Sequence, residues 1–203
     1  GRDLARYPRL NSLRIVLASG SPYRRELLAR LRLEFDVKTP GIDETALQSE
    51  TAGATALRLA QAKARAVGAK FPRALVIGCD QVAELDEKCL GKPGSHGNAV
   101  AQLTAMRGKT VVFHTAVALL NSQTSAMQAA DVPTTVLFRD YSDREIERYL
   151  EIERPYDCAG SAKIEGLGIV LVERVVSDDP SALIGLPLMR LAAMLRVEGV
   201  TVV

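Results

Sequence analysis

The chain has 203 residues, of which 47% are hydrophobic and 25% are charged, and its formal net charge is +2. This length allows a sizeable core, in one large domain or in two lobes that share a cleft. The near-balance of charge excludes a broad basic face, so nucleic acid is not an expected partner and a small anionic ligand fits better. No apolar run is long enough to span a membrane, and no membrane partner is expected.

The cysteines and the N-terminal segment indicate in which cellular compartment the protein is expected. Cys79, Cys89 and Cys158 are scattered, odd in number and form no C-x-x-C pair. This pattern argues against a disulfide framework and against a structural zinc site. The N-terminus lacks the apolar segment of a signal peptide, so we expect a cytoplasmic protein. We expect residues 1–11 to be an N-terminal extension and residues 12–203 to be a single domain.

The first predicted unit is a buried strand that turns directly into a helix. The apolar run Leu13–Leu17 predicts the strand, Ser21 is a good N-cap, Pro22 suits the first helical position, and the helix is predicted to reach about Leu31. The polar side chains of this turn are Ser19, Ser21, Arg24 and Arg25. Free amide groups and the positive end of the helix dipole attract anions, so the turn is a candidate phosphate-binding site.

An ordinary strand-to-helix turn, whose serines only cap the helix and whose arginines face solvent, is the alternative. Arg24 and Arg25 lie in the first helical turn, where the dipole favours acids. A bound anion would remove that local cost, which favours the phosphate interpretation.

The next elements carry an acidic loop and a buried lysine. Residues 34–39 are predicted as a strand ended by Pro40-Gly41, and the acidic pair Asp43-Glu44 follows in a loop. The composition and spacing of residues 52–69 predict a helix. Lys63 falls on its apolar stripe, so its side chain either snorkels past the edge of the core or points into a site.

A second central strand, Leu75–Cys79, runs into Asp80-Gln81. Ligands bind at the carboxyl ends of strands in an open α/β sheet, which makes an acid at this place a functional candidate. Residues 82–90 are predicted as a hairpin that turns at Asp86-Glu87 and leads to Lys92.

The remaining elements complete a mixed sheet with helices packed on it. We predict a helix over 97–106, two antiparallel strands over 110–120 and 125–139, a helix over 142–151, irregular chain over 155–164, a strand over 169–175, and a last helix that ends at about 196. The helix at 142 opens with a capping box, Ser142 to Glu145. His114, on a predicted strand, is expected to be structural, and His96, in a glycine-rich loop, is expected to be solvated.

Nine polar residues on loops or strand ends then carry the candidate chemistry. They are Ser19, Ser21, Arg24, Arg25, Glu44, Lys63, Asp80, Lys92 and Glu165. The acids suit a hard divalent cation and the bases suit phosphates, which is the equipment of phosphoryl chemistry. The residues alone therefore predict a protein that binds a phosphorylated metabolite, with or without a metal ion.

The sequence resembles the Maf-type nucleoside triphosphate pyrophosphatases. The motifs that carry the resemblance, in chain order, are LASGSPYRRELL, IDET, RLAQAKA, VIGCDQV, LGKP, CAGSAKIEGLG and IGLPL. The resemblance implies an α/β fold with a mixed β-sheet and flanking helices, in two lobes around a central cleft, as in inosine-triphosphate pyrophosphatases. It also implies hydrolysis of a nucleoside triphosphate to the monophosphate and pyrophosphate, a divalent metal such as magnesium or manganese, and a homodimer.

The resemblance also implies roles for single residues. Ser19, Ser21 and Arg24, with Arg25 beside them, would bind phosphates, as would Lys63 and Lys92. Glu44 would help to hold the metal. Asp80 would lie at the metal and accept a proton from the attacking water. A bound metal lowers the pKa of water, so this role does not require a raised pKa of the acid.

Three positions resemble the subgroup that acts on 7-methyl-GTP, namely Tyr23, Gln81 and Glu165. Methylation of the guanine imidazole ring leaves a delocalised cation, which an aromatic face attracts and a carboxylate complements. Tyr23 would stack on the base, Glu165 would accept from the guanine N–H edge, and Gln81 would shape the pocket.

Two alternatives remain from the sequence. One is a broader house-cleaning pyrophosphatase that acts on other modified or pyrimidine triphosphates. The other is a nucleotide-binding regulator of septum formation that need not turn over. The acids Asp80 and Glu44 favour an enzyme, because a pure binder of a triphosphate gains nothing from carboxylates beside the phosphates.

Overall fold

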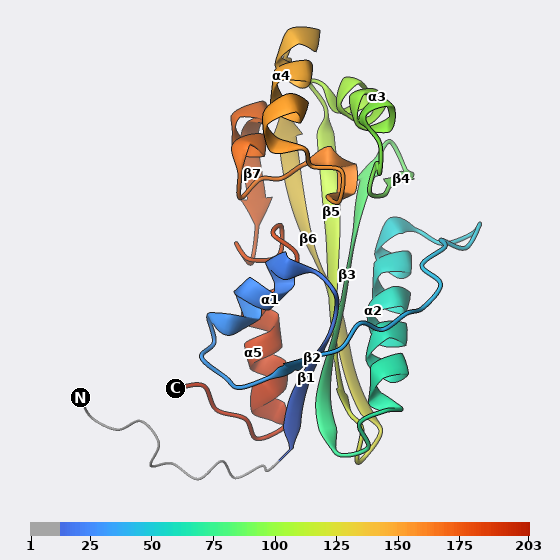
Figure 1. Ribbon diagram of the computed structural model, residues 1–203, viewed down its shortest axis with the longest axis vertical. Helices are drawn as coiled ribbons and strands as arrows, with labels where there is room; N and C mark the ends of the chain where they lie inside the picture. The colour runs from blue at the N-terminus through green and yellow to red at the C-terminus, as the bar shows by residue number, and fades with distance from the viewer. Residues whose placement is uncertain (1–12) are drawn as a thin grey trace.

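A mixed β-sheet runs the length of the molecule in the computed structural model, which describes residues 13–203 (Figure 1). Seven strands lie in this part of the chain, in the order β2-β1-β3-β5-β6-β7, with β4 paired to β3. The strands are β1 (Arg14–Ala18), β2 (Asp36–Val37), β3 (Ala74–Leu85), β4 (Lys88–Leu90), β5 (Thr110–Asn121), β6 (Ala126–Phe138) and β7 (Val172–Ser177). The predicted extension 1–11 lies outside the described residues.

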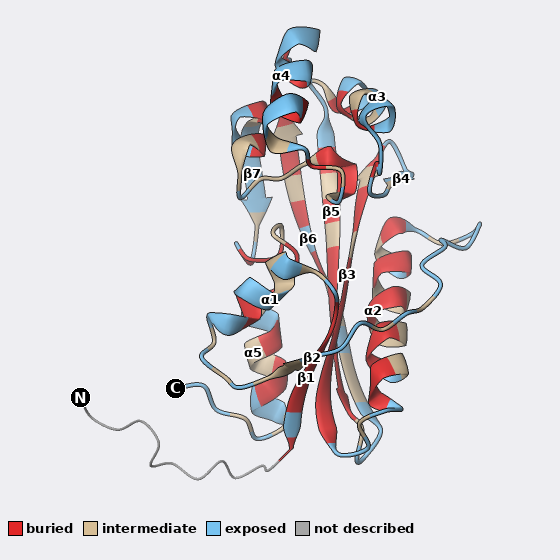
Figure 2. Cartoon of the chain, in the orientation of Figure 1, coloured by how far each residue is buried: buried red, intermediate tan, exposed pale blue. Residues whose placement is uncertain are grey.

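The helices cover the sheet in two groups (Figure 1). They are α1 (Pro22–Ala29), α2 (Ala52–Gly68), α3 (His96–Met106), α4 (Asp143–Glu153) and α5 (Leu188–Val197), with short 3₁₀ turns η2 (Ala159–Ser161) and η3 (Leu167–Leu171). The first group lies at the β1 end of the sheet, where α1 and α5 pack on one face and α2 packs on the other. The second group, α3 and α4, lies at the opposite end of the long strands, which we call the far lobe. Buried residues line the sheet-facing sides of these helices (Figure 2). The predicted fold class is confirmed.

Helix α2 lies unusually close to strand β3. A Cβ atom built at Gly78 would be 1.9 Å from the carbonyl oxygen of Ala60. Only glycine permits this approach, and Ala56, Ala60 and Ala64 on the facing side of α2 are fully buried. The close contact brings the next turn of α2, with Lys63, against the middle of β3.

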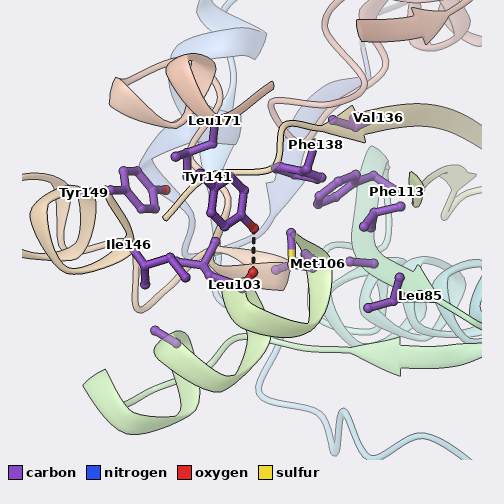
Figure 3. Packing of buried hydrophobic residues seen from close by; sticks show 14 of the residues in the cluster. Leu85, Leu103, Met106, Phe113, Val136, Phe138, Tyr141, Ile146, Tyr149 and Leu171 are labelled. Atoms are coloured by element: carbon purple, nitrogen blue, oxygen red, sulfur yellow. Dashed lines mark hydrogen bonds between the residues drawn. The ribbon is translucent and has the colours of Figure 1, made fainter. Parts of the chain in front are cut away.

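The far lobe has its own aromatic core between the sheet, α3 and α4 (Figure 3). Tyr141 donates a hydrogen bond of 2.6 Å to the carbonyl oxygen of Leu103, which fixes α3 against the end of β6. Tyr149 of α4 donates to the carbonyl oxygen of Ser161 at 2.7 Å and accepts from the amide of Lys163 at 3.0 Å. The buried phenol satisfies two backbone groups and so holds the chain over 159–163 in place.

Three predicted strand boundaries are wrong. Strand β3 continues through Asp80 to Leu85, because its antiparallel ladder with β5 extends to Glu84. Strand β2 has only two residues. Residues 169–171 belong to η3 rather than to a strand, because the carboxylate of Glu153 accepts from the amide of Leu167 at 2.8 Å and holds this segment against α4. Among the helices of residues 13–203, none combines the length and the apolar character of a membrane span.

His114 on β5 lies between two acids on neighbouring strands. Its Nδ1 is 2.7 Å from Oδ2 of Asp131, and its Nε2 is 2.8 Å from Oε2 of Glu84. The hydrogen bond with Asp131, with a smaller contribution from Glu84, raises the pKa of His114 above its ordinary value against the opposing effect of burial. Only the imidazolium can donate to both acids, so the expected structural role of His114 is a charged cross-strand link.

We expect His114→Gln to lower the free energy of unfolding by about 1–2 kcal/mol at pH 6 and by less at pH 9. Because the pKa of His114 is higher in the folded state, the protonated imidazole stabilises the folded protein. This stabilisation is complete below the ordinary pKa of about 6.5 and is lost as pH rises through the folded-state pKa. Urea unfolding at the two pH values measures the difference. His96→Gln is the control, since His96 forms an exposed pair with Glu147. An equal loss at both pH values would contradict the prediction.

Candidate active site

A cleft of about 660 Å³ is lined by residues of α1, α2 and the middle of β3, together with the loop before α2 and the segment 157–165. Its lining includes ten of the predicted site residues: Ser19, Ser21, Tyr23, Arg24, Glu44, Lys63, Asp80, Gln81, Lys92 and Glu165. Arg25 is not in the lining, and its side chain is exposed. Successive helical residues point about 100° apart, so α1 turns Arg25 away when it turns Arg24 toward the cleft. The structure therefore does not bring Arg25 to the site with the others.

The cleft forms where strand β3 loses its neighbour on one side. The parallel ladder of β1 ends at Ala18, opposite Gly78, and the pairing with β4 begins at Ala83. Residues 79–82 lie between these ladders on that edge of β3. Asp80 thus lies in mid-strand, but it still follows the carboxyl end of β1, where an open α/β sheet places its ligands.

Lys63 joins two carboxylates in the wall of the cleft. Its Nζ is 2.9 Å from Oδ1 of Asp80 and 2.7 Å from Oε1 of Glu44, and it donates a longer bond of 3.4 Å to the carbonyl oxygen of Cys79. Lys63 is 5% exposed and Asp80 is 8% exposed, whereas the side chain of Glu44 is 52% exposed. Lys63 therefore points into the site rather than snorkelling, and its three N–H donors all have acceptors.

Burial and charge act in opposite directions on the two acids. Burial raises the pKa of Asp80 above its ordinary value, although Lys63 and Arg24 oppose the shift. Burial also acts to raise the pKa of Glu44, but the hydrogen bond and charge of Lys63, with the charges of Lys92 and Arg24, lower it overall. Three cationic side chains, those of Lys63, Lys92 and Arg24, thus surround Glu44, the more exposed of the two acids.

Glu44 and Asp80 are also the candidate ligands for a metal ion. Among residues 13–203 no group of three or more His, Cys, Asp or Glu side chains could hold one. Mg²⁺ commonly uses only one or two carboxylates, together with water and substrate phosphate oxygens. Oε1 of Glu44 and Oδ1 of Asp80 contact the same nitrogen, so the two carboxylates lie close together and match this number of protein ligands.

The turn between β1 and α1 has the form expected of a phosphate-binding site. The hydroxyl of Ser19 accepts from the amide of Ser21 at 3.1 Å, and the hydroxyl of Ser21 caps α1 by accepting from the amide of Arg24 at 3.4 Å. Both hydroxyl protons can still be donated to an anion. The Nε of Arg24 donates to the carbonyl oxygen of Gly185 at 2.9 Å, which fixes the guanidinium beside the turn.

Tyr23 contacts Asp157, a residue that no local sequence pattern of its own marks as part of the site. Its hydroxyl donates to the carboxylate of Asp157 at 3.2 Å. The Nζ of Lys163 lies 5.5 Å from the centroid of the tyrosine ring and pairs with Glu153 at 2.8 Å. Asp157 and Tyr23 are 134 positions apart, and the only local signal is that Asp157 directly precedes the CAGSAK motif.

Glu165 lies near the same group. Burial raises the pKa of its carboxyl, the charge of Lys163 opposes this, and the charges of Glu153 and Asp157 add to it. Lys163 pairs with Glu153 at 2.8 Å, so the carboxyl groups of Asp157 and Glu165 are two further acids in this part of the cleft.

Gln81 is fixed by its amide nitrogen. Its Nε2 donates to Oγ1 of Thr115 at 3.0 Å and to the carbonyl oxygens of Leu183 and Ala182 at 2.9 and 3.3 Å. These carbonyl acceptors assign the orientation of the amide, because a flipped group would place its oxygen against them. Gln81 therefore anchors the loop before α5 and leaves its carbonyl oxygen as the group available to a ligand.

The fold and the cleft define a class, the mixed α/β proteins whose cleft combines cationic side chains with carboxylates. A family model described as Maf-like protein matches residues 14–198, and the chain belongs to this family.

Two relatives extend the comparison. A protein of Methylobacillus flagellatus named 7-methyl-GTP pyrophosphatase is 61% identical over 189 residues, which cover 93% of this chain and 98% of that protein. A Cupriavidus metallidurans protein of the same name is 59% identical over 91% of this chain and 93% of its own. Among solved structures, the Staphylococcus aureus Ham1 protein has a TM-score of 0.46 and 15% identity, over 63% of this chain and 72% of that one.

Proposed function

We propose that this protein hydrolyses 7-methyl-GTP to the monophosphate and pyrophosphate. The observation that carries the proposal is the division of charge in the cleft. Arg24, Lys63 and Lys92 gather around Glu44, whereas Asp157 accepts from the hydroxyl of Tyr23 and interacts electrostatically with Glu165. A ligand with several negative charges at one end and a positive charge at the other complements this arrangement.

At the phosphate end, each group of the chain has a proposed task. Ser19, Ser21 and Arg24 bind phosphate oxygens, and Lys92 neutralises them from the exposed side. Lys63 reaches a phosphate by exchanging one of its present acceptors. Asp80 orients the attacking water and accepts its proton.

Glu44 and Asp80 are the residues that would hold a divalent cation, magnesium or manganese. When bound, the cation supplies neutralisation of phosphate charge and lowers the pKa of water. The two relatives bear names that state the reaction, not the metal. Activity measured with and without a chelator, and restored by each ion in turn, tests this requirement.

At the base end, the positive charge of a methylated guanine is the feature to be recognised. Glu165 and Asp157 complement it electrostatically, and the carbonyl oxygen of Gln81 can accept from the N–H edge of the base. The ammonium of Lys163 covers one side of the Tyr23 ring, so stacking of the base uses the other side.

Acids at the two ends of the cleft argue against the two alternative functions. A regulator that only binds a triphosphate would be weakened by Asp80, which is 8% exposed and lies beside the phosphate site. A house-cleaning enzyme that acts on pyrimidine triphosphates or on other modified triphosphates with uncharged bases would gain nothing from Asp157 and Glu165. Comparison of kcat/KM for 7-methyl-GTP, GTP, UTP and dTTP tests the proposal, and the highest value is expected for 7-methyl-GTP. Equal values for 7-methyl-GTP and GTP would contradict the proposed substrate.

The double substitution Glu165→Gln with Tyr23→Arg is expected to lower the ratio of kcat/KM for 7-methyl-GTP over UTP by at least about tenfold. The glutamine removes one negative charge, and the arginine both removes the aromatic ring and neutralises Asp157. The phosphate end is unchanged, so UTP should lose less than 7-methyl-GTP.

Steady-state kinetics with both substrates measure this ratio. Glu173→Gln, which removes an exposed carboxylate outside the cleft lining, is the control and should leave the ratio unchanged. A parallel fall for both substrates would mean that Tyr23 and Glu165 support the general site rather than base recognition.

A homodimer in the cytoplasm completes the proposal. Exposed apolar side chains, including Val175 and Val176, lie on β7, the last strand in the order of the described sheet, and Ile152 lies on α4. Burial of such side chains favours association. The three free cysteines suit a reducing compartment. Light scattering coupled to size-exclusion chromatography measures the mass in solution, and fractionation of cells tests the compartment.

A further inference from the structure

The loop that carries Glu44 has little regular structure to hold it. Residues 38–51 connect β2 to α2 without a helix or strand. The side chain of Glu44 is 52% exposed, yet its Oε1 lies 2.7 Å from Nζ of Lys63. Burial of Glu44 itself cannot fix this contact, so its geometry depends on what anchors the loop.

Arg58, from the second turn of α2, anchors the loop at two points. Its Nε and Nη2 form a fork to the carboxylate of Glu50, at 2.6 and 2.8 Å. The same Nη2 donates to the carbonyl oxygen of Thr45, the residue after Glu44, at 3.0 Å. A planar guanidinium can make these three bonds at once, whereas an ammonium has no such fork.

Glu50 connects this pair to the rest of the loop and to the helix. Its Oε1 also accepts from the amide of Leu47 at 2.9 Å and from the hydroxyl of Thr55 at 3.2 Å. The hydrogen bond from Arg58 is the main cause of the low pKa of Glu50, about 2, with a further contribution from the amide of Leu47. The pair is therefore charged at neutral pH.

Helix α2 thus supplies both the anchor and the partner of Glu44. Arg58 holds the backbone beside Glu44, and Lys63, five residues further along the same helix, binds its carboxylate. We propose that Arg58 and Glu50 form a clamp that positions Glu44 at the phosphate end of the cleft. Arg58 is not in the cleft lining, so it acts as a positioning residue through Glu44. The inference rests on the proposed function for the role of Glu44.

The test is a double-mutant cycle between Arg58 and Glu44, measured as kcat and KM for 7-methyl-GTP. Arg58→Lys keeps the charge and loses the fork, and it is expected to lower kcat about tenfold with less than a twofold change in KM. Glu50→Gln should have a similar effect. In the Glu44→Gln background, Arg58→Lys should lower kcat by less than about twofold further, because the positioned group is already lost.

Arg14→Lys is the matched control. Arg14 forms an exposed pair with Asp36 at 2.7 Å, outside the cleft lining, and the same substitution there should leave kcat unchanged. Circular dichroism and thermal unfolding identify any variant that fails to fold, and Glu50→Gln then replaces Arg58→Lys in the cycle. A clamp with only a structural role would give losses that multiply in the double variant, and this result would overturn the inference.

Two further results distinguish failure of the clamp from failure of the proposed function. If Glu44→Gln retains the parental kcat, there is no positioned group and the inference fails, while the proposed function stands. If the parent hydrolyses none of the triphosphates, the proposed function fails. Cleavage after Glu44 by a glutamate-specific protease then decides the inference, which requires faster cleavage in Arg58→Lys than in the parent or in Arg14→Lys.

Discussion

Replacing Asp80 by Asn is expected to reduce kcat by roughly two orders of magnitude or more while the protein remains folded. The amide has the size of the carboxylate but cannot accept the proton of an attacking water. Its oxygen can still accept from Lys63, whose Nζ lies 2.9 Å from Oδ1 of Asp80. The local packing against α2 is therefore retained, and the loss falls on the chemical step.

Single-turnover kinetics with 7-methyl-GTP measure this step directly. Asp140→Asn is the control, because Asp140 is an exposed acid in the far lobe and outside the cleft lining. Thermal unfolding verifies that both variants fold. A variant at Asp80 that retains the parental rate would remove this residue from the proposed mechanism.

Truncation of the cationic residues at the phosphate end has the next largest expected effect. Arg24→Ala and Lys92→Ala should each lower kcat/KM roughly thirtyfold or more, which corresponds to a loss of about 2 kcal/mol of transition-state stabilisation, because each leaves a phosphate oxygen without a charged partner. Arg24 also donates to the carbonyl oxygen of Gly185, so its truncation frees the loop before α5 and should cost more than that of Lys92.

Arg25→Ala provides a matched control from the same helix. The exposed side chain of Arg25 is outside the cleft lining, so its removal should change kcat/KM by less than about twofold at 0.15 M salt. Increasing ionic strength should weaken substrate use by the parent and do so less in Lys92→Ala. If Arg24→Ala and Arg25→Ala lose activity equally, the phosphate site extends over the outer face of α1.

Local patterns in the sequence predicted most of the elements. Ser21 and Pro22 begin α1, and Ser142 with Glu145 forms the capping box of α4. The turn at Asp86 and Glu87 has positive φ values of 50° and 63°, as a two-residue hairpin requires. Caps, turns and hydrophobic periodicity depend on residues a few positions apart, and these can be recognised without the tertiary structure.

The boundaries that failed depend on long-range pairing. Asp80 was predicted to follow a strand, but the ladder between β3 and β5 continues past it. The segment 169–171 has a strand-like composition, yet it belongs to the 3₁₀ turn that begins at Leu167, whose amide donates to the carboxylate of Glu153 on α4. Groups from another part of the chain, the backbone of β5 in the first case and the carboxylate of Glu153 in the second, decide such cases, because they satisfy backbone hydrogen bonds in one conformation rather than another.

The sequence by itself determined which residue types serve the candidate site, since ten of the predicted residues line the cleft. Only the tertiary structure decided their contacts. It directed Lys63 to Asp80 and Glu44 through the close approach of α2 at Gly78. The fold also brought Asp157 to Tyr23 across 134 positions. Hydrogen bonds and ion pairs act over a few ångströms, and chain separation says nothing about such distances until the packing of sheet and helices sets them.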